Sequence, residues 1–136
     1  MAGYSGTPLA KKLGFKENFK ACIFNAPANY MELLRPLPHA VTFFKKPQND
    51  LDIIHLFSTS KSELSKLLLE SLQSIKSNGM IWVSWPKKAS KVPSEISEDT
   101  VREVALPLGL VDVKVCAVDE IWSGLKLVIR KKNRMT

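Results

Sequence analysis

The sequence predicts an α/β fold in which one mostly parallel sheet of about six strands has helices on both faces and ends in an antiparallel hairpin. Two observations predict it. Residues 51–86 have the pattern of a strand, a helix and a second strand, and residues 111–129 have the pattern of two strands joined by a turn. Helices and strands alternate through the rest of the chain, which is typical of this class.

The central unit carries the clearest signals. Residues 51–57 form a short apolar run, typical of a strand that is covered on both faces, and residues 81–85 form a second one that Pro86 ends. Between them, Ser60 and Glu63 have the spacing of a reciprocal capping box, and Asn78-Gly79 is expected to end the helix in a left-handed turn. One helix face is expected to hold Leu64, Leu67, Leu68, Leu72 and Ile75. A connection of this kind predicts a right-handed crossover between parallel strands.

The segments before this unit are shorter. We expect a helix from Thr7-Pro8 to Gly14, strands at 20–25 and 41–44, and a helix at 28–34 between those strands. The polar loop 45–50 is too short for a helical crossover, so the strands on either side of it are not expected to be parallel neighbours.

After the central unit, Ser97 is expected to cap a helix that Pro107 and Gly109 stop. Residues 111–118 alternate in a way that places Val111, Val113, Val115 and Ala117 on one face of a half-exposed strand near a sheet edge. A turn at Trp122-Ser123-Gly124 is expected to lead into its hairpin partner, 125–129. Together the elements predict one Rossmann-like domain over 1–136, with a mobile start at 1–6 and a basic tail at 130–136.

Composition narrows the class of protein. The chain has 136 residues, 45% of them hydrophobic and 24% charged, which fits a globular domain that can bury a core. It has no apolar run long enough for a membrane span and no apolar signal-peptide core, so we expect a cytoplasmic protein with no membrane partner. Cys22 and Cys116 are expected to be reduced and buried, and no metal-type Cys/His spacing occurs.

The formal net charge of +7 is concentrated at the two ends of the chain. Residues 1–50 carry seven basic and three acidic groups, residues 51–100 carry six of each, and residues 101–136 carry seven and four. An excess of basic groups favours anionic partners in general.

Four stretches of the chain form a recognisable set: YSGTPLAKKLG (4–14), the NAP after the first strand, WVSWPKKAS (82–90) and LPLGLVDVKVCAVDEIWSGLKLVIRK (106–131). Together they resemble one small bacterial family, known as domain of unknown function 3052. The resemblance implies a bacterial origin and supports the fold, and it implies no particular reaction. The last four strands also resemble the second half of class I SAM-dependent methyltransferases.

A ligand is expected beyond the carboxyl ends of the strands, where neighbouring connections leave on opposite faces of the sheet. If strands 20–25 and 51–57 are neighbours, that crevice would suit a small anion or a nucleotide, because backbone donors at a helix start favour negative charge. Lys91 is expected to add charge nearby. The candidate ligand-binding residues are Asn25, Asn29, Ser58, Thr59, Ser60, Lys61, Trp85, Lys87 and Lys88. The alternative is that the hydroxyls only cap the helix and the lysines only solvate a loop.

A working methyltransferase fits the residues less well. SAM and dinucleotide sites use glycines after the first strand and an acidic residue after the second. Here the first loop reads NAPANY, the second strand runs into Lys45-Lys46, and Asp50 could replace the missing acid only if its loop folds back. The alternative functions are therefore a degenerate methyltransferase-like protein or a weak nucleic-acid binder, in which the basic tail would meet phosphates through Arg130, Lys131, Lys132 and Arg134.

The sequence shows no evident set of catalytic residues, so we expect a protein that binds a small anion or a protein partner rather than an enzyme. It does not indicate which cofactor, if any, the protein uses. His55 lies between apolar neighbours and is expected to be a core histidine. Asp119 and Glu120 would point to opposite faces of a strand, Cys116 has no activating neighbour in the sequence, and tryptophans 82, 85 and 122 suit packing better than base stacking.

Overall fold

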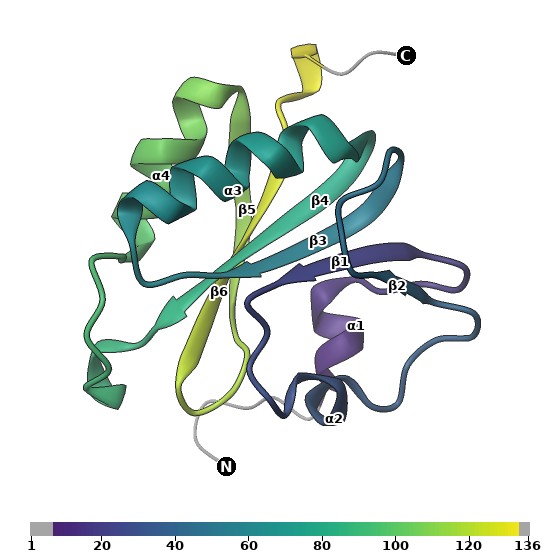
Figure 1. Cartoon of the computed structure of the whole chain (residues 1–136), viewed down its shortest axis with the longest axis horizontal. Coiled ribbons are helices and arrows are strands. Elements are labelled where there is room, and N and C mark those ends of the chain that lie inside the picture. The colour runs from purple at the N-terminus through teal and green to yellow at the C-terminus, as the bar shows by residue number, and fades with distance from the viewer. Residues whose placement is uncertain (1–6, 134–136) are drawn as a thin grey trace.

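The computed structural model describes residues 7–133. They form a six-stranded sheet with the strand order β2-β1-β3-β4-β6-β5 (Figure 1). Its strands are β1 (Lys20–Phe24), β2 (Thr42–Phe44), β3 (Leu51–Phe57), β4 (Ile75–Pro86), β5 (Leu110–Ala117) and β6 (Trp122–Ile129). The first four are parallel, and β6 pairs antiparallel with both β4 and β5. The mixed α/β class and the antiparallel ending are as predicted.

Helices cover both faces of the sheet (Figure 1). Helices α3 (Lys61–Ser74) and α4 (Glu98–Ala105) lie on one face, and the short helices α1 (Leu9–Leu13) and α2 (Tyr30–Leu34) lie on the other. Three single-turn 3-10 helices complete the described chain: η1 (Lys88–Ser90), η2 (Leu106–Leu108) and η3 (Lys131–Asn133). No helix within residues 7–133 is long and apolar enough to cross a membrane.

The central parallel unit is confirmed, and so is the separation of β2 from β3. Strand β3 pairs parallel with β4 through Ile54 and Ile81, while β1 lies between β2 and β3. The six-residue loop 45–50 therefore passes from β2 to β3 without a helix, as its length required.

The predicted end of α3 is wrong. The helix ends at Ser74, and Ile75 already belongs to β4, where it pairs with Leu51. Asn78-Gly79 lies inside the strand and makes no left-handed turn, because Gly79 is not among the positive-φ glycines. Gly79 instead allows the backbone of β4 to lie close to β3, because a Cβ atom at this position would be 3.1 Å from the Leu51 carbonyl oxygen. The irregularity between Leu51 and Ile53 in the β3–β4 register absorbs the extra residues.

Two predictions about the hairpin are also corrected. Trp122-Ser123-Gly124 opens β6, and the turn lies before it, where the Asp119 carboxylate accepts hydrogen bonds from the backbone N–H groups of Ile121 and Trp122. Strand β5 is an edge strand, as expected, but a register shift between Asp112 and Lys114 breaks its alternation. Val111, Val113, Val115 and Ala117, which were predicted to share one face of the strand, therefore do not share it. Val113 and Val115 are about half exposed, at 53% and 48%.

The mobile start predicted for residues 1–6 lies outside the described residues, as does Arg134 at the end of the predicted basic tail.

Candidate functional site

The carboxyl ends of β1 and β3 meet where the chain leaves the sheet in two directions. After β1 the chain enters α2 on one face, and after β3 it enters α3 on the other. This is the arrangement in which open α/β sheets bind ligands. Asn25, which follows β1 with a positive φ of 58°, closes the gap between the two strands: its side-chain amide donates to the Phe57 carbonyl oxygen at 3.1 Å. Two hollows lie near this edge of the sheet, one at the start of α3 and one at the carboxyl ends of β1 and β2.

The first hollow lies at the start of α3. It has a volume of about 420 Å³ and is lined by Thr59, Ser60, Pro93, Ser94 and Glu95. The Ser60 hydroxyl accepts a hydrogen bond from the Glu63 N–H, as the capping motif predicted. The reciprocal half of the motif is absent, because the Glu63 carboxylate accepts from the Ser58 hydroxyl at 2.8 Å.

The anion position at this helix start is filled by the protein itself. The Glu95 carboxylate accepts from the Lys61 backbone N–H at 2.8 Å, and the Glu95 N–H donates to the Thr59 carbonyl at 2.9 Å. A carboxylate at a helix N-terminus takes the place that a bound anion would occupy. Sequence reasoning missed Glu95, because it lies in a Lys- and Ser-rich loop 34 residues beyond Lys61.

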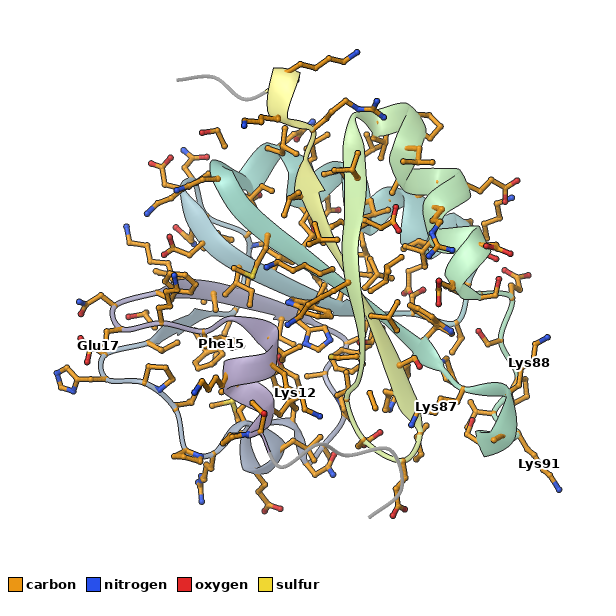
Figure 2. All side chains as sticks on the ribbon, turned by 180° about the vertical axis from the view of Figure 1, so that it is seen from behind. Lys12, Phe15, Glu17, Lys87, Lys88 and Lys91 are labelled. Atoms are coloured by element: carbon orange, nitrogen blue, oxygen red, sulfur yellow. The ribbon has the colours of Figure 1, made fainter. Side chains whose placement is uncertain are left out.

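The lysines predicted to bind an anion either contact other protein groups or point away from the predicted site. The Lys61 ammonium pairs with Glu103 at 3.0 Å, and the Lys87 ammonium donates to the Asp119 carbonyl at 2.8 Å. Lys88 and Lys91 point outward at the edge of the molecule (Figure 2). They lie in and just after η1. The structure therefore does not gather the predicted lysines around one ligand.

Two further predicted residues have other surroundings. Trp85 is 7% exposed and belongs to the hydrophobic cluster under α3 and α4, so it presents no face to a ligand. Asn29 is exposed at the start of α2, where its carbonyl accepts from the Leu33 N–H.

The second hollow, which we call the β1–β2 pocket, lies at the carboxyl ends of β1 and β2 beside α2. Its volume is about 470 Å³. Its walls are mostly apolar, and a single charged side chain belongs to the lining. The lining residues are Ile23, Ala26, Pro27, Ala28, Tyr30, Met31, Phe43, Phe44 and Lys45.

A buried polar chain lies behind this pocket. The Tyr30 hydroxyl is hydrogen-bonded to His55 Nδ1 at 2.8 Å, and His55 Nε2 is hydrogen-bonded to the Ser84 hydroxyl at 2.7 Å. His55 and Ser84 are fully buried, and Tyr30 is 3% exposed. Burial lowers the pKa of His55 to about 3 and raises that of Tyr30 well above its usual value. The imidazole is therefore neutral at pH 7 and can donate to one hydroxyl and accept from the other.

This arrangement makes His55 a core histidine, as predicted, with both ring nitrogens satisfied. Its ring also stacks on Phe57, with centroids 4.3 Å apart. Because Ser84 has no exposed surface, its hydroxyl cannot act as a nucleophile on an external substrate. Sequence reasoning missed Ser84 and the contact between Tyr30 and His55; the available signal was a hydroxyl inside the apolar run of β4.

Other predicted groups are structural as well. Cys22 and Cys116 are free thiols; Cys22 is buried as predicted, whereas Cys116 is only half-buried. Trp82 is buried, and its indole N–H donates to the Leu13 carbonyl oxygen at 2.8 Å. Among residues 7–133, no three His, Cys, Asp or Glu side chains are placed to hold a metal ion.

Asp50 does not fold back toward the pocket. It directly precedes β3, at the amino end of that strand, whereas the pocket lies at the carboxyl ends of the parallel strands. The carboxyl end of β2 is followed by Lys45 and Lys46. This edge therefore lacks both the glycines and the acidic residue that SAM sites of the Rossmann type use.

Solved structures confirm the fold. A SAM-dependent methyltransferase from Aquifex aeolicus matches with a TM-score of 0.65 at 18% identity, covering 89% of this chain and 88% of that one. A complex named DhpI-SAH matches with a TM-score of 0.62 at 10% identity, covering 90% and 81%. Magnesium protoporphyrin IX methyltransferase from Synechocystis, with bound SAH, matches with a TM-score of 0.60 at 10% identity, covering 89% and 78%. At these identities the likeness is one of fold.

The sequence comparisons are more specific about the family. No curated protein matches the chain. The profile of the family described as protein of unknown function (DUF3052) matches residues 46–131, which include β3 to β6 together with α3 and α4. This is more than half of the 136 residues, and the chain therefore belongs to the DUF3052 family.

Proposed function

We propose that the chain binds a small ligand that combines a flat aromatic ring with an anionic group, and that it does so in the β1–β2 pocket. Nucleotides are one class of metabolite that has both features. The observation that carries the proposal is the pocket's lining, in which apolar walls that include Phe43 and Phe44 accompany the charged Lys45 at the carboxyl edge of the sheet.

The size and chemistry of the pocket support this class of ligand. Small-molecule sites are mostly apolar clefts of about 300–1,000 Å³ with a few polar groups that fix orientation. The walls formed by Ile23 and Phe43 would contact a flat ring, and the Lys45 ammonium would meet a negative charge. The Tyr30 hydroxyl is engaged with His55, so Tyr30 would contribute the edge of its ring to the wall.

Of the predicted site residues, Asn25 keeps a role in this proposal, because its amide holds the loop after β1 against β3. Ser58 and Ser60 anchor the start of α3, on the other face of the sheet. SAM-dependent methylation is the alternative that the fold neighbours suggest. It has weaker support, because no carboxylate follows β2 to bind ribose hydroxyls and no glycine follows β1.

Thermal unfolding and calorimetry with ADP, AMP, adenosine, SAM, SAH and inorganic phosphate test the proposal. We expect ADP to raise the melting temperature and to bind more tightly than adenosine or phosphate alone, because only ADP offers both ring and charge. Lys45→Gln should weaken ADP binding about tenfold. Lys46→Gln makes the same change of charge one residue outside the lining and should leave binding unchanged.

A second variant tests the ring position. Ala28→Phe adds a bulky side chain to an exposed loop residue of the lining, so it should block binding without disturbing the core. The absence of any ligand-induced shift across the panel would contradict the proposal, as would equal ADP affinity in Lys45→Gln and wild type. Tighter binding of SAM than of ADP would favour the methyltransferase-like alternative.

A further inference from the structure

A separate hollow of about 710 Å³ lies between α1 and the β5–β6 hairpin, and we call it the α1–hairpin cavity. It shares no lining residue with the β1–β2 pocket. Three lysines from two elements line it, together with two residues that carry hydroxyls and one that carries a thiol. The lining consists of Thr7, Lys11, Lys12, Lys114, Val115, Cys116, Ala117 and Ser123.

Two more lysines lie next to this cavity. Lys126 of β6 is the direct cross-strand partner of Lys114, so the two side chains share a face of the sheet. Burial first, and then the charges of Lys114 and Lys16, lower the pKa of Lys126. The charges of Lys12 and Lys114 also act on the Cys116 thiol, whose pKa burial raises. Lys114 and Lys16 are thus close enough to Lys126 to repel it.

Several lysines in or near the cavity have no carboxylate beside them. The ion pairs of Lys61, Lys76 and Arg102 lie elsewhere in the described chain. Within residues 7–133, no carboxylate lies within 4.0 Å of the ammonium groups of Lys11, Lys16, Lys114 or Lys126.

Like charges that face each other across a strand pair destabilise a sheet, and a bound polyanion would relieve that repulsion. We propose that the α1–hairpin cavity binds a small molecule that carries two or more phosphate groups. Lysine ammonium groups are common phosphate ligands, and three of them line the cavity. The Ser123 hydroxyl, which is also in the lining, can donate to a further phosphate oxygen.

The shape of the site favours a small molecule over a nucleic acid. Nucleic-acid surfaces present basic side chains as a patch or stripe along the molecule, often with exposed aromatic rings. Here the lysines line an open hollow of about 710 Å³, a volume within the range of metabolite sites, and its lining contains no aromatic side chain.

Calorimetric titration with tripolyphosphate tests the site. We expect wild-type protein to bind tripolyphosphate more tightly than inorganic phosphate, with an affinity that falls as salt is raised. Lys11→Gln/Lys114→Gln should weaken binding of tripolyphosphate at least about tenfold. Lys88→Gln/Lys91→Gln removes the same charge from two exposed lysines outside the lining and should keep the wild-type affinity.

Alkylation of Cys116 reports on the position of the bound molecule. Cys116 lines the cavity and is half-buried, whereas Cys22 has no exposed surface. We expect tripolyphosphate to slow alkylation of Cys116 by iodoacetamide in wild-type protein and not in Lys11→Gln/Lys114→Gln.

Three results would overturn the proposal: no binding of tripolyphosphate by the wild type, equal weakening in both double variants, or unchanged alkylation of Cys116 on binding. Binding of an RNA oligonucleotide that depends on Lys11 and Lys114, without binding of tripolyphosphate, would equally overturn it in favour of nucleic acid. The β1–β2 pocket is tested through Lys45 and Ala28, so failure at one site does not imply failure at the other.

Discussion

The two faces of the sheet are built differently. Under α3 and α4 the buried cluster is almost wholly apolar, and the charges at its rim have partners: Lys61 pairs with Glu103, and Arg102 contacts Glu98, Asp99 and Asp112. Under α1 and α2 the core contains the hydrogen-bonded chain from Tyr30 through His55 to Ser84. The lysine-lined cavity opens on this same side.

The difference teaches that a lysine's availability depends on the partner that the fold brings to it. Lys61 and Lys87 follow strand ends, as ligand-binding residues often do. Their ammonium groups nevertheless contact groups of the protein itself: Lys61 pairs with the Glu103 carboxylate, and Lys87 donates to the Asp119 carbonyl oxygen. Lys114 and Lys126 lie inside strands, and no carboxylate among residues 7–133 pairs with them. We therefore expect the α3/α4 face to respond to mutation mainly in stability, and the α1/α2 face to respond to pH and anions as well.

The largest effect is expected on the apolar face. Leu68 of α3 is fully buried, so Leu68→Ala should reduce the free energy of unfolding by about 3–4 kcal/mol through lost burial and a residual cavity. Its neighbour Leu69 is 48% exposed, and Leu69→Ala should change stability by less than about 0.5 kcal/mol. Urea unfolding measures both. Similar losses in the two variants would contradict the assignment of this helix face to the core.

On the other face, His55 should make stability depend on pH. Its pKa is about 3 in the folded protein and returns to about 6.5 on unfolding, so the unfolded chain binds the proton more readily. This contribution is fully present above pH 6.5 and is lost as the pH falls toward 3. The linkage predicts a loss of about 3 kcal/mol between pH 7 and pH 4.

Urea unfolding at a series of pH values measures this loss in wild type and in His55→Gln. The comparison concerns the slope with pH and not the absolute stability, since the variant also disturbs the hydrogen bonds to Tyr30 and Ser84. The free energy of unfolding of His55→Gln should therefore depend less steeply on pH than that of wild type. Parallel pH profiles for the two proteins would show that His55 is not the responsible group.

Local patterns predicted most of the fold. The apolar run of β3, the helical spacing in α3 and the short loop 45–50 each depend on residues close in sequence, and all three gave the observed arrangement. The end of α3 could not be predicted in the same way, because it depends on the pairing of Ile75 with Leu51, far away along the chain. The interruption in β5 is likewise a property of its pairing with β6.

The candidate site was predictable only as a location. The carboxyl edge of the sheet and the Ser60 cap follow from local signals. The groups that decide its chemistry are distant in sequence: Glu95 reaches the start of α3 from 34 residues away, and His55 meets Tyr30 and Ser84 across 25 and 29 residues. One chain without related sequences carries no signal for such pairs.

A smaller effect is expected where a charge is compensated. Glu95→Gln should reduce the free energy of unfolding by about 0.5–1 kcal/mol, because it removes a negative charge from the N-terminus of α3. The loss should shrink at high salt, which screens the helix dipole. Glu120→Gln, at an exposed residue of the hairpin turn, is the matched control and should be nearly neutral. Equal effects of the two changes would mean that the Glu95 contact contributes nothing.

The smallest effect has the opposite sign and is expected where charge is uncompensated. Because the pKa of Lys126 is lowered in the folded protein, its protonated form destabilises the fold at neutral pH, and the cost is relieved as the pH rises through that pKa. Lys126→Gln should therefore raise the free energy of unfolding by about 0.5 kcal/mol at low salt. Lys114→Gln should act in the same direction. The double variant should gain less free energy of unfolding than the sum of the two single gains, because both changes remove the same repulsion.

Urea unfolding of these variants with and without added salt distinguishes repulsion from a packing effect. A gain that persists at high salt would mean that repulsion between these two lysines is not what the variants relieve.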